Sequence, residues 1–211
     1  MSEPHTHADP HSTAPNSRRV LDTLLDAMLQ RPEEHAQTTA EIHRCFGQEQ
    51  ATLIIDMCGF TRTTHQHGIV AFLLMIHQMH RVCCPVIAEH GGKLIKTEAD
   101  NLFCLFGSVE AALSASLDMI ERLETVNLLL PEDRHLYASI GIGYGLILNI
   151  EERDLFGDEV NLACKLSEDI ATKNAILFTE RAHEQLAPRT DTVVRDVSIS
   201  GMALTYFELT R

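Results

Sequence analysis

The sequence predicts one mixed α+β domain built on a βαββαβ core, and three observations lead to this prediction. Residues 51–55 (ATLII) form an unbroken apolar run, as in a strand covered on both faces. A long segment with apolar residues at helical spacing follows, and then two short strand-like stretches around a polar turn at residues 98–101. A second helical segment and a long strand-like stretch complete the order strand, helix, strand, strand, helix, strand.

The first 48 residues are expected to lie outside this core. Residues 1–18 are rich in Pro, His, Ser and Thr without periodicity, so we predict a disordered tail. Residues 19–48 are predicted to form two helices, the first with a clear apolar stripe. This helical segment could dock on the domain or pair two chains, and the pattern does not separate these roles. The domain itself is assigned to residues 49–211.

Two helices and a long strand follow the first strand of the core. The spacing of apolar residues predicts one helix over residues 63–89, ended by His-Gly-Gly, and another over residues 109–123. The stretch HLYASIGIGYGLILNI is then predicted to be a strand in which Gly141, Gly143 and Gly145 share one face. Such glycines allow another element to approach closely, and we favour a packed helix over a bound ligand as that element.

The remaining residues predict a C-terminal extension of alternating helices and strands. A helix is expected to begin near Glu159, followed by the strand AILFT and a short helix over residues 180–186. Two further strands, TVVRDVSI and LTYFEL, are expected to end the domain. The helix near Glu159 carries Asn161 and Lys165 one turn apart on one face, which suits either an anionic ligand or an ordinary exposed, capped helix.

The composition argues against several classes of partner. The formal net charge of −13 at pH 7 disfavours a nucleic acid or an anionic membrane surface as the main partner. No apolar run approaches the roughly 20 residues of a spanning helix, so no membrane span is expected. The six cysteines form no C-x-x-C pair and fall mostly in apolar stretches, as reduced thiols do, so a cytoplasmic location is expected.

Four stretches together resemble the class III nucleotidyl cyclase catalytic domain: DMCGFT, GGKLIKTEAD with LFCLF behind it, IGIGYG and DLFGDEVNLACKL. The resemblance covers about residues 50–207. It implies a ferredoxin-like core with a C-terminal extension and a head-to-tail homodimer whose active sites are each built from both chains. The implied reaction converts a nucleoside triphosphate to a 3′,5′-cyclic monophosphate and pyrophosphate.

The resemblance also implies two divalent cations, Mg²⁺ or Mn²⁺. Asp56 and Asp100 match the two metal-binding aspartates of the family, and Met57 is assigned to the same metal site. Two such ions can lower the pKa of the attacking ribose 3′-hydroxyl and hold the triphosphate. The loop after the first strand matches the one whose backbone amides hold the phosphates, namely Cys58, Gly59, Phe60 and Thr61.

Lys96 and Asp154 match the positions at which the family recognises the purine base. A lysine donating to N1 and a carboxylate accepting from the 6-amino group fit adenine, whereas guanine presents the opposite pattern at both atoms. ATP is therefore the expected substrate. Lys96 and Asp100 lie only four residues apart, yet the family assigns them to different active sites, so one hairpin is expected to serve both sites of a dimer.

Asn161 matches the asparagine that orients the ribose. The sequence departs from the family pattern in three ways. Lys165 stands where most members carry a transition-state arginine, and loses the planar fork that grips two phosphate oxygens. Two serines, Ser198 and Ser200, stand near the place of a triphosphate-binding lysine, and Ala99 replaces the glycine before the metal aspartate.

These departures leave two function hypotheses open. One is a working adenylate cyclase, favoured by the presence of both metal carboxylates, the adenine pair and Asn161. The alternative is a catalytically weak or inactive cyclase-homology module that binds nucleotide or a regulatory partner, favoured by Lys165 and the two serines. Another triphosphate substrate is a third possibility.

Overall fold

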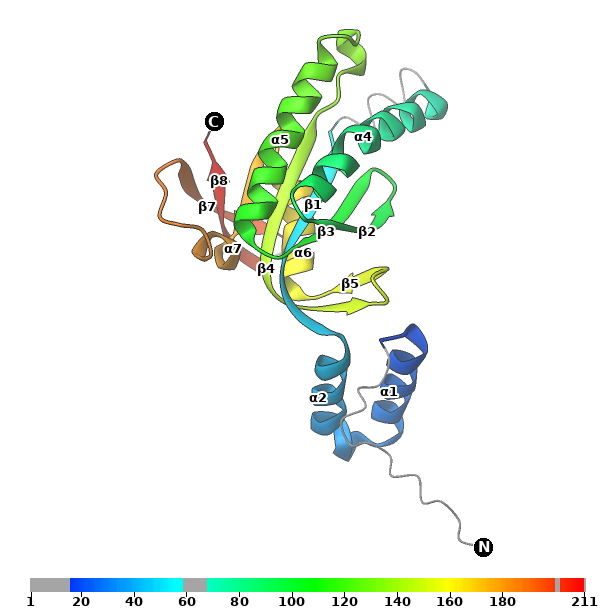
Figure 1. The fold of residues 1–211 in the computed structure, drawn as a ribbon. Coiled ribbons are helices and arrows are strands. Elements are labelled where there is room, and N and C mark those ends of the chain that lie inside the picture. Colours follow the sequence, from blue (N-terminus) through cyan, green and yellow to red (C-terminus); the bar gives the residue numbers. More distant parts are fainter. Residues whose placement is uncertain (1–15, 59–67, 200–201, 211) are drawn as a thin grey trace, which may run out of the picture.

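The computed structural model describes residues 16–58, 68–199 and 202–210, and an eight-stranded sheet forms its centre. The strand order is β2-β3-β1-β4-β6-β8-β7, and β5 pairs with β4 outside this path (Figure 1). Neighbouring strands are antiparallel except β4 and β6, which are parallel. The strands are β1 (Gly47–Met57), β2 (Lys93–Glu98), β3 (Asn101–Phe106), β4 (Ala138–Ile150), β5 (Asp154–Phe156), β6 (Ile176–Thr179), β7 (Thr192–Ile199) and β8 (Met202–Leu209).

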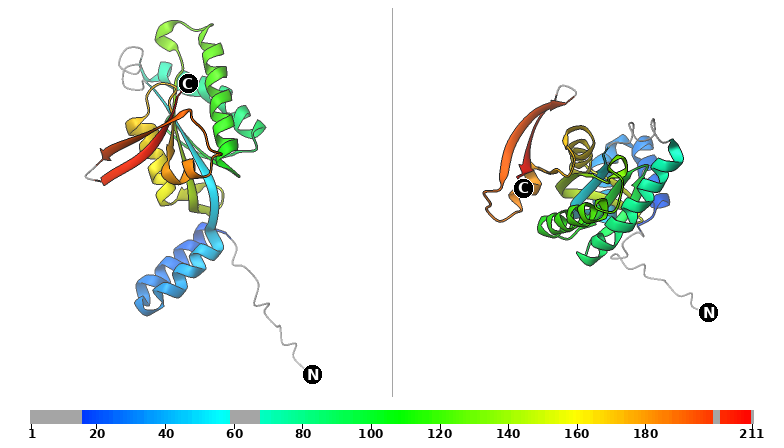
Figure 2. Two further views of the ribbon diagram at one scale, coloured as in Figure 1. Left: turned by 90° about the vertical axis from the view of Figure 1, so that its left-hand side faces the viewer. Right: turned by 90° about the horizontal axis from the view of Figure 1, so that it is seen from above.

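Helices cover both faces of this sheet. Helices α4 and α5 lie along one face, and α6 lies on the other, while α1 and α2 form a hairpin at one end of the sheet (Figures 1 and 2). The helices are α1 (Arg18–Gln30), α2 (His35–Phe46), α4 (Ile69–Glu89), α5 (Val109–Asn127), α6 (Asp158–Lys165) and α7 (Glu180–Glu184), and a π-helical turn (Leu166–Ile170) continues α6. The predicted α+β class with a βαββαβ core is confirmed.

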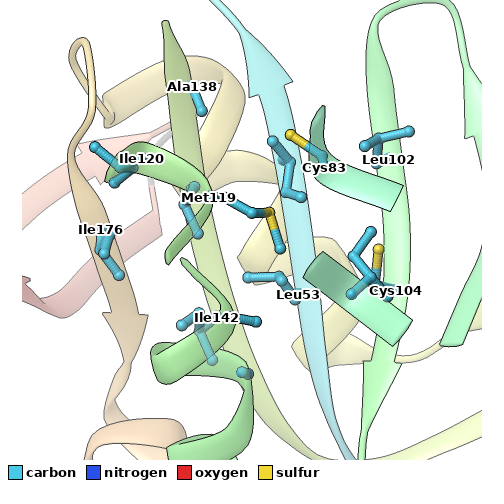
Figure 3. Close-up of a cluster of buried hydrophobic side chains, with 14 of the residues drawn as sticks. Leu53, Cys83, Leu102, Cys104, Met119, Ile120, Ala138, Ile142 and Ile176 are labelled. Carbon is cyan, nitrogen blue, oxygen red and sulfur yellow. The ribbon is translucent and has the colours of Figure 1, made fainter. Parts of the chain in front are cut away.

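The sheet has a separate hydrophobic core on each face, because successive side chains of a strand point to opposite faces. Leu53 and Ile55 of β1 belong to the larger core, between the sheet and helices α4 and α5. Figure 3 shows Leu53 there beside Met119 of α5. Ile54 instead belongs to the smaller core beside α6. Asp56, two residues after Ile54, is therefore on the α6 side of the sheet.

The ends of the two long helices have local causes. The hydroxyl of Ser108 accepts a hydrogen bond from the Ala111 N–H at 3.2 Å, which caps the start of α5. Helix α4 ends at Glu89, and Gly91 follows with φ +72, a conformation that favours glycine. The predicted start of this helix at residues 63–67 lies outside the described residues.

Helix α4 is the only helix in the described part of the chain that is long and apolar enough to cross a bilayer. Its apolar residues also serve the core, since six of them are buried against the sheet and α5: Phe72, Met75, Met79, Cys83, Val86 and Ile87. A core helix passes the same test of length and composition, so α4 is not a clear membrane span.

The glycines of β4 allow α6 to lie directly on the strand, as predicted. A Cβ added at Gly141 would lie 2.1 Å from the Ala163 carbonyl oxygen, and one at Gly143 would lie 2.5 Å from the Glu159 carbonyl oxygen. Both neighbours are backbone atoms of α6, so neither can move without the helix. The close approach of a helix, rather than a ligand, accounts for these two glycines.

Gly141→Ala is therefore expected to destabilise the fold by about 1–3 kcal/mol, the usual cost of overpacking a core. Gly107→Ala is the matched control, because a Cβ at Gly107 has no heavy atom within 4 Å. Urea unfolding of both variants measures the difference. Equal stability of the Gly141 and Gly107 variants would contradict the close packing of α6 on β4.

The N-terminal hairpin docks on the end of β4, one of the two roles that the sequence left open. Leu21 of α1 and Ile42 and Phe46 of α2 form a third buried cluster with Ile150. Part of the predicted tail belongs to this hairpin, because Ser17 caps α1 and Arg18 begins it. Residues 1–15 of the predicted tail lie outside the described residues.

Two boundaries near the start of the domain differ from the sequence-based expectation, and two short elements were not predicted. The second N-terminal helix ends at Phe46, and β1 begins at Gly47 rather than at residue 51, because residues 47–51 already pair with β4. The short strand β5 was not predicted, and neither was the π-helical turn after α6. All six cysteines are free thiols, as expected.

Candidate active site

Two aspartates meet at one end of the sheet. Ile55 of β1 pairs with Leu102 of β3, so the next residue, Asp56, lies beside the start of β3. Asp100 belongs to the turn that immediately precedes β3. Burial, then the negative charges of Asp100 and Glu168, raise the pKa of Asp56 to about 7. Burial also raises the pKa of Asp100, which is half-buried. A divalent cation would compensate these crowded charges.

The turn before Asp100 carries a strained residue. Ala99, which stands where the cyclase pattern has glycine, adopts φ +52. This left-handed conformation costs a residue with a Cβ about 1 kcal/mol more than glycine. The turn therefore places Ala99 in a backbone conformation that favours glycine, the residue of the cyclase pattern.

A third carboxylate, Glu168, lies near the two aspartates and was not predicted. It belongs to the π-helical turn and accepts a 2.6 Å hydrogen bond from the Asn101 side-chain amide. Burial, then the charge of Asp169, raise the pKa of Glu168. Only the pairing of β1 with β3 and the unusual turn after α6 bring it here, and neither is visible in the sequence.

The raised pKa of Asp56 predicts a pH-dependent effect of Asp56→Asn. The pKa rises from 3.8 to about 7 on folding, so the stability associated with the proton is present below pH 3.8 and is lost as the pH rises through 7. Asparagine cannot ionise and avoids this loss. In a metal chelator, Asp56→Asn should raise the melting temperature relative to wild type more at pH 8 than at pH 5. An equal difference at both pH values would show that Asp56 titrates normally.

A bulge in β2 directs Lys96 to the α6 side of the sheet. Leu94 pairs with Cys104 and Lys96 pairs with Phe103, so Ile95 is an extra residue in the ladder. Without the bulge, Leu94 and Lys96 would share a face. Because Phe103 belongs to the core beside α6, its pairing partner Lys96 lies on that side as well, with its Nζ 4.6 Å from the centre of the Phe103 ring.

Lys96 and Asp154, the two residues assigned to the base site, form an ion pair with each other. The Lys96 Nζ donates to Asp154 Oδ1 at 2.8 Å and to Glu98 Oε1 at 2.6 Å. Burial acts to lower the pKa of Lys96, but the hydrogen bonds to these two carboxylates outweigh it, and the pKa is raised. The side chain of Lys96 is only 21% exposed, so the pair is partly shielded from water.

Helix α6 presents Asn161 and Lys165 one turn apart, with Asn161 exposed and Lys165 half-buried. The helix is anchored by the buried carboxylate of Glu159, which accepts hydrogen bonds from the Tyr144 N–H at 3.2 Å and the Thr179 hydroxyl at 2.6 Å. This anchor and the glycines of β4 fix the position of α6, and with it the position of Asn161 and Lys165.

The predicted phosphate loop is described only at its first residue. The Cys58 N–H donates to the Tyr137 carbonyl oxygen at 3.0 Å, so in this conformation that amide is already used. The Cys58 thiol shares a 2.8 Å hydrogen bond with the Ser139 hydroxyl. Gly59, Phe60 and Thr61 lie outside the described residues.

Of the two serines in the place of the family lysine, Ser198 is exposed on β7, and Ser200 lies outside the described residues. The structure therefore brings together Asp56 with Asp100, Lys96 with Asp154, and Asn161 with Lys165. Asp56 and Lys96 are on the side of the sheet that α6 covers, and Asn161 and Lys165 lie on α6 itself.

Comparisons with known proteins identify the family of the chain. Residues 47–208 match the family described as "Adenylate and Guanylate cyclase catalytic domain", so the chain belongs to that family. The resemblance inferred from the sequence is confirmed. Putative adenylate cyclase 3 of Rhizobium meliloti is 29% identical over 141 residues, which are 67% of this chain and 24% of that protein. The chain therefore spans about a quarter of that relative's length.

Solved structures show the same fold. An adenylate/guanylate cyclase/hydrolase from Silicibacter pomeroyi superposes with a TM-score of 0.63 at 26% identity, over 78% of this chain and 98% of that one. A bacterial light-regulated adenylyl cyclase superposes with a TM-score of 0.67 at 19% identity, over 90% of this chain and 64% of that one. The fold is thus that of the adenylate and guanylate cyclase catalytic domains.

Proposed function

We propose that this chain is an adenylate cyclase that converts ATP to 3′,5′-cyclic AMP and pyrophosphate at a homodimer interface. The observation that carries the proposal is the pair of crowded, half-buried carboxylates, Asp56 and Asp100, on the same side of the sheet as the Lys96–Asp154 pair. Carboxylates with no cation between them gain little from such an arrangement, whereas a two-metal phosphoryl reaction needs it.

The residues at this end of the sheet suit Mg²⁺ or Mn²⁺. Asp56 and Asp100 offer the hard oxygen ligands that these ions prefer, and Mg²⁺ is usually held by one or two carboxylates together with substrate phosphates. The Met57 side chain is buried in the core, so Met57 could contribute only its backbone carbonyl oxygen. No group of three or more His, Cys, Asp or Glu side chains that could hold a metal ion is found in the described ranges.

The reaction requires the ribose 3′-hydroxyl to attack the α-phosphorus, breaking its bond to the pyrophosphate oxygen. Bound metal ions would lower the pKa of that hydroxyl and neutralise the triphosphate. Asn161 orients the ribose, and Lys165, one turn further along α6, places a positive charge against the developing negative charge on the phosphate. The family pattern assigns the phosphates to the backbone amides of residues 59–61, which lie outside the described residues.

Base selection rests on Lys96 and Asp154. The lysine donates to N1 of adenine, and the carboxylate accepts from the 6-amino group. Guanine carries a proton on N1 and an oxygen at C6. Its N1–H would therefore face the donor Lys96, and its C6 oxygen would face the acceptor Asp154. The ion pair between the two side chains supports this assignment because it holds both groups at one place before the base binds.

A dimer is proposed because Lys96 on β2 and Asp100 in the turn after β2 are assigned to different active sites. Lys96 is paired with Asp154 of its own chain, and Asp100 with the Asp56 region, so two copies can each complete the other's site. We expect sedimentation to show a dimer at tens of micromolar protein in the presence of ATP and Mg²⁺. A monomer under those conditions would contradict a site shared between chains.

The alternative function is a cyclase-homology module that binds nucleotide or a regulatory partner with little or no turnover. Lys165 favours it, because an ammonium group cannot form the two parallel hydrogen bonds that an arginine makes to phosphate. Ser198 favours it as well, since a serine supplies no charge to the triphosphate.

An assay of wild-type protein with ATP, GTP, CTP and UTP, each with Mg²⁺ and with Mn²⁺, tests the proposal. Cyclic AMP and pyrophosphate should form in equal amounts from ATP, and the other triphosphates should react more slowly. Absence of cyclic product under every condition would favour the binding module, and faster turnover of another triphosphate would overturn the adenine assignment.

The proposal places the chain in the cytoplasm, where ATP and a reducing environment are available. The six free thiols support this compartment. The net charge of −13 continues to argue against a nucleic acid as partner.

A further inference from the structure

The N-terminal segment is hydrogen-bonded to the backbone at the end of β4, where the turn to β5 begins. The Asn16 side-chain amide donates to the Asn149 carbonyl oxygen at 2.8 Å, and its oxygen accepts from the Glu151 N–H at 2.8 Å. Both bonds go to the backbone on either side of the end of β4. Asn16 thus fixes where the chain leaves β4 for the turn that leads to Asp154.

The turn that Asn16 holds has an unfavourable backbone conformation of its own. Glu151 and Glu152 both have positive φ, +54 and +56, which residues with a Cβ rarely adopt. Lys93 of β2 forms an ion pair with Glu152, and Asn16 bonds the N–H of Glu151. Contacts from two other parts of the chain therefore stabilise the turn, and one of them comes from the N-terminal hairpin.

Hydrophobic packing also joins the N-terminal hairpin to the end of β4. Leu21 of α1 and Phe46 of α2 are buried with Ile150, the last residue of β4, and Ile150 pairs directly with Asp154. Burial of side chains of this size is the main contribution to the stability of such a contact. Helix α1 is therefore held at a fixed place relative to β5.

From this place, Arg18 reaches the base-recognition carboxylate. Its Nη1 lies 3.9 Å from Asp154 Oδ2, while Lys96 donates to Asp154 Oδ1. Asp22, one turn further along α1, holds the Arg18 Nε at 3.4 Å. The two oxygens of Asp154 thus face two different cations, one from the cyclase domain and one from a helix that precedes the family match at residue 47.

We propose that Arg18 is a positioning residue for nucleotide recognition, which holds Asp154 in the orientation that accepts the 6-amino group of adenine. This inference rests on the proposed function. Lys96 and the Leu155 N–H, at 3.0 Å, both hold Oδ1 of Asp154. A carboxylate held at one oxygen can rotate about its Cβ–Cγ bond, whereas Arg18 adds a contact at Oδ2 that opposes this rotation. The same contact couples the N-terminal hairpin to the base site, so movement of α1 would change the affinity for ATP.

The test uses variants of the full chain with a matched control. Arg18→Ala removes the contact, Arg18→Lys keeps the charge, and Arg19→Ala removes a neighbouring exposed arginine of the same helix. Calorimetry with 3′-deoxy-ATP and 3′-deoxy-GTP, which lack the attacking hydroxyl, measures binding without turnover. Arg18→Ala should weaken binding of 3′-deoxy-ATP by about two- to fivefold, in line with a partly exposed ion pair, and leave 3′-deoxy-GTP unchanged.

The remaining variants are compared by their affinity for 3′-deoxy-ATP. Arg18→Lys should restore part of the loss, and Arg19→Ala should match wild type. In an Asp154→Asn background, Arg18→Ala should cause no further loss, because the two residues act through one contact. Equal affinity of wild type and Arg18→Ala for 3′-deoxy-ATP would overturn the inference, as would an equal loss with both nucleotides.

Hydrogen exchange separates this inference from the proposed function, because it needs no nucleotide. Amides of residues 151–155 should exchange faster in Arg18→Ala than in wild type, and Arg19→Ala should leave them unchanged. Unaltered exchange in Arg18→Ala would overturn the role of Arg18 even if the protein is an active cyclase. A wild-type protein that binds neither nucleotide would overturn the proposed function, and the nucleotide role of Arg18 with it.

Discussion

Asp56→Ala and Asp100→Ala are each expected to abolish cyclic nucleotide formation, with a loss of about 10³-fold or more, because each removes a carboxylate of a two-metal site. Neither change opens a cavity in the core, since both residues lie at the ends of strands. The rate of cyclic AMP formation in Mn²⁺ and in Mg²⁺ measures the effect.

Folding must be separated from catalysis in these variants. Both should keep the circular dichroism spectrum and the cooperative unfolding of wild type, and Asp26→Ala, which removes an exposed carboxylate from α1, should keep full activity. Retained activity in either the Asp56 or the Asp100 variant would refute the two-metal mechanism.

Lys165→Ala is expected to lower kcat by about 10- to 10³-fold with a smaller change in KM, because a charge that acts mainly on the transition state affects kcat. Lys165→Arg should keep or raise activity, since the planar fork can hold two phosphate oxygens. Steady-state kinetics of both variants gives the measurement.

Arg81→Ala is a suitable control for Lys165, because it removes an exposed cation from another helix, α4. It should leave kcat unchanged. Rates for Lys165→Ala equal to those of wild type would show that the α6 face is an ordinary solvated surface, and a rise in KM alone would assign Lys165 to ground-state binding.

The core and most of its element order could be predicted because they depend on local patterns. The run at residues 51–55, the helical spacing after it and the turn at residues 98–101 each indicate one element. The close packing of α6 on Gly141 and Gly143 was predictable for a similar reason, since three glycines at alternate positions leave one face of a strand without side chains.

Other features depend on pairing between distant residues and could not be read from local patterns. The extra residue Ile95 in β2, which turns Lys96 to the α6 side, is defined only by the register with β3. Glu168 comes close to Asp56 through the π-helical turn, and the three-residue strand β5 is too short for a periodicity. Arg18 lies 136 positions before Asp154, so only the fold shows their contact.

Mixing two inactive variants would test most directly the proposal that each active site is built from both chains of a dimer. The test takes the metal carboxylates of a site from one chain and Asn161 and Lys165 of α6 from the other. One variant carries Asp100→Ala, and the other carries Asn161→Ala with Lys165→Ala. Random exchange of subunits should place all the wild-type residues in one of the two sites of each mixed dimer, restoring about a quarter of wild-type activity. A mixture as inactive as its two components, despite exchange shown by sedimentation of differently tagged chains, would contradict a shared site.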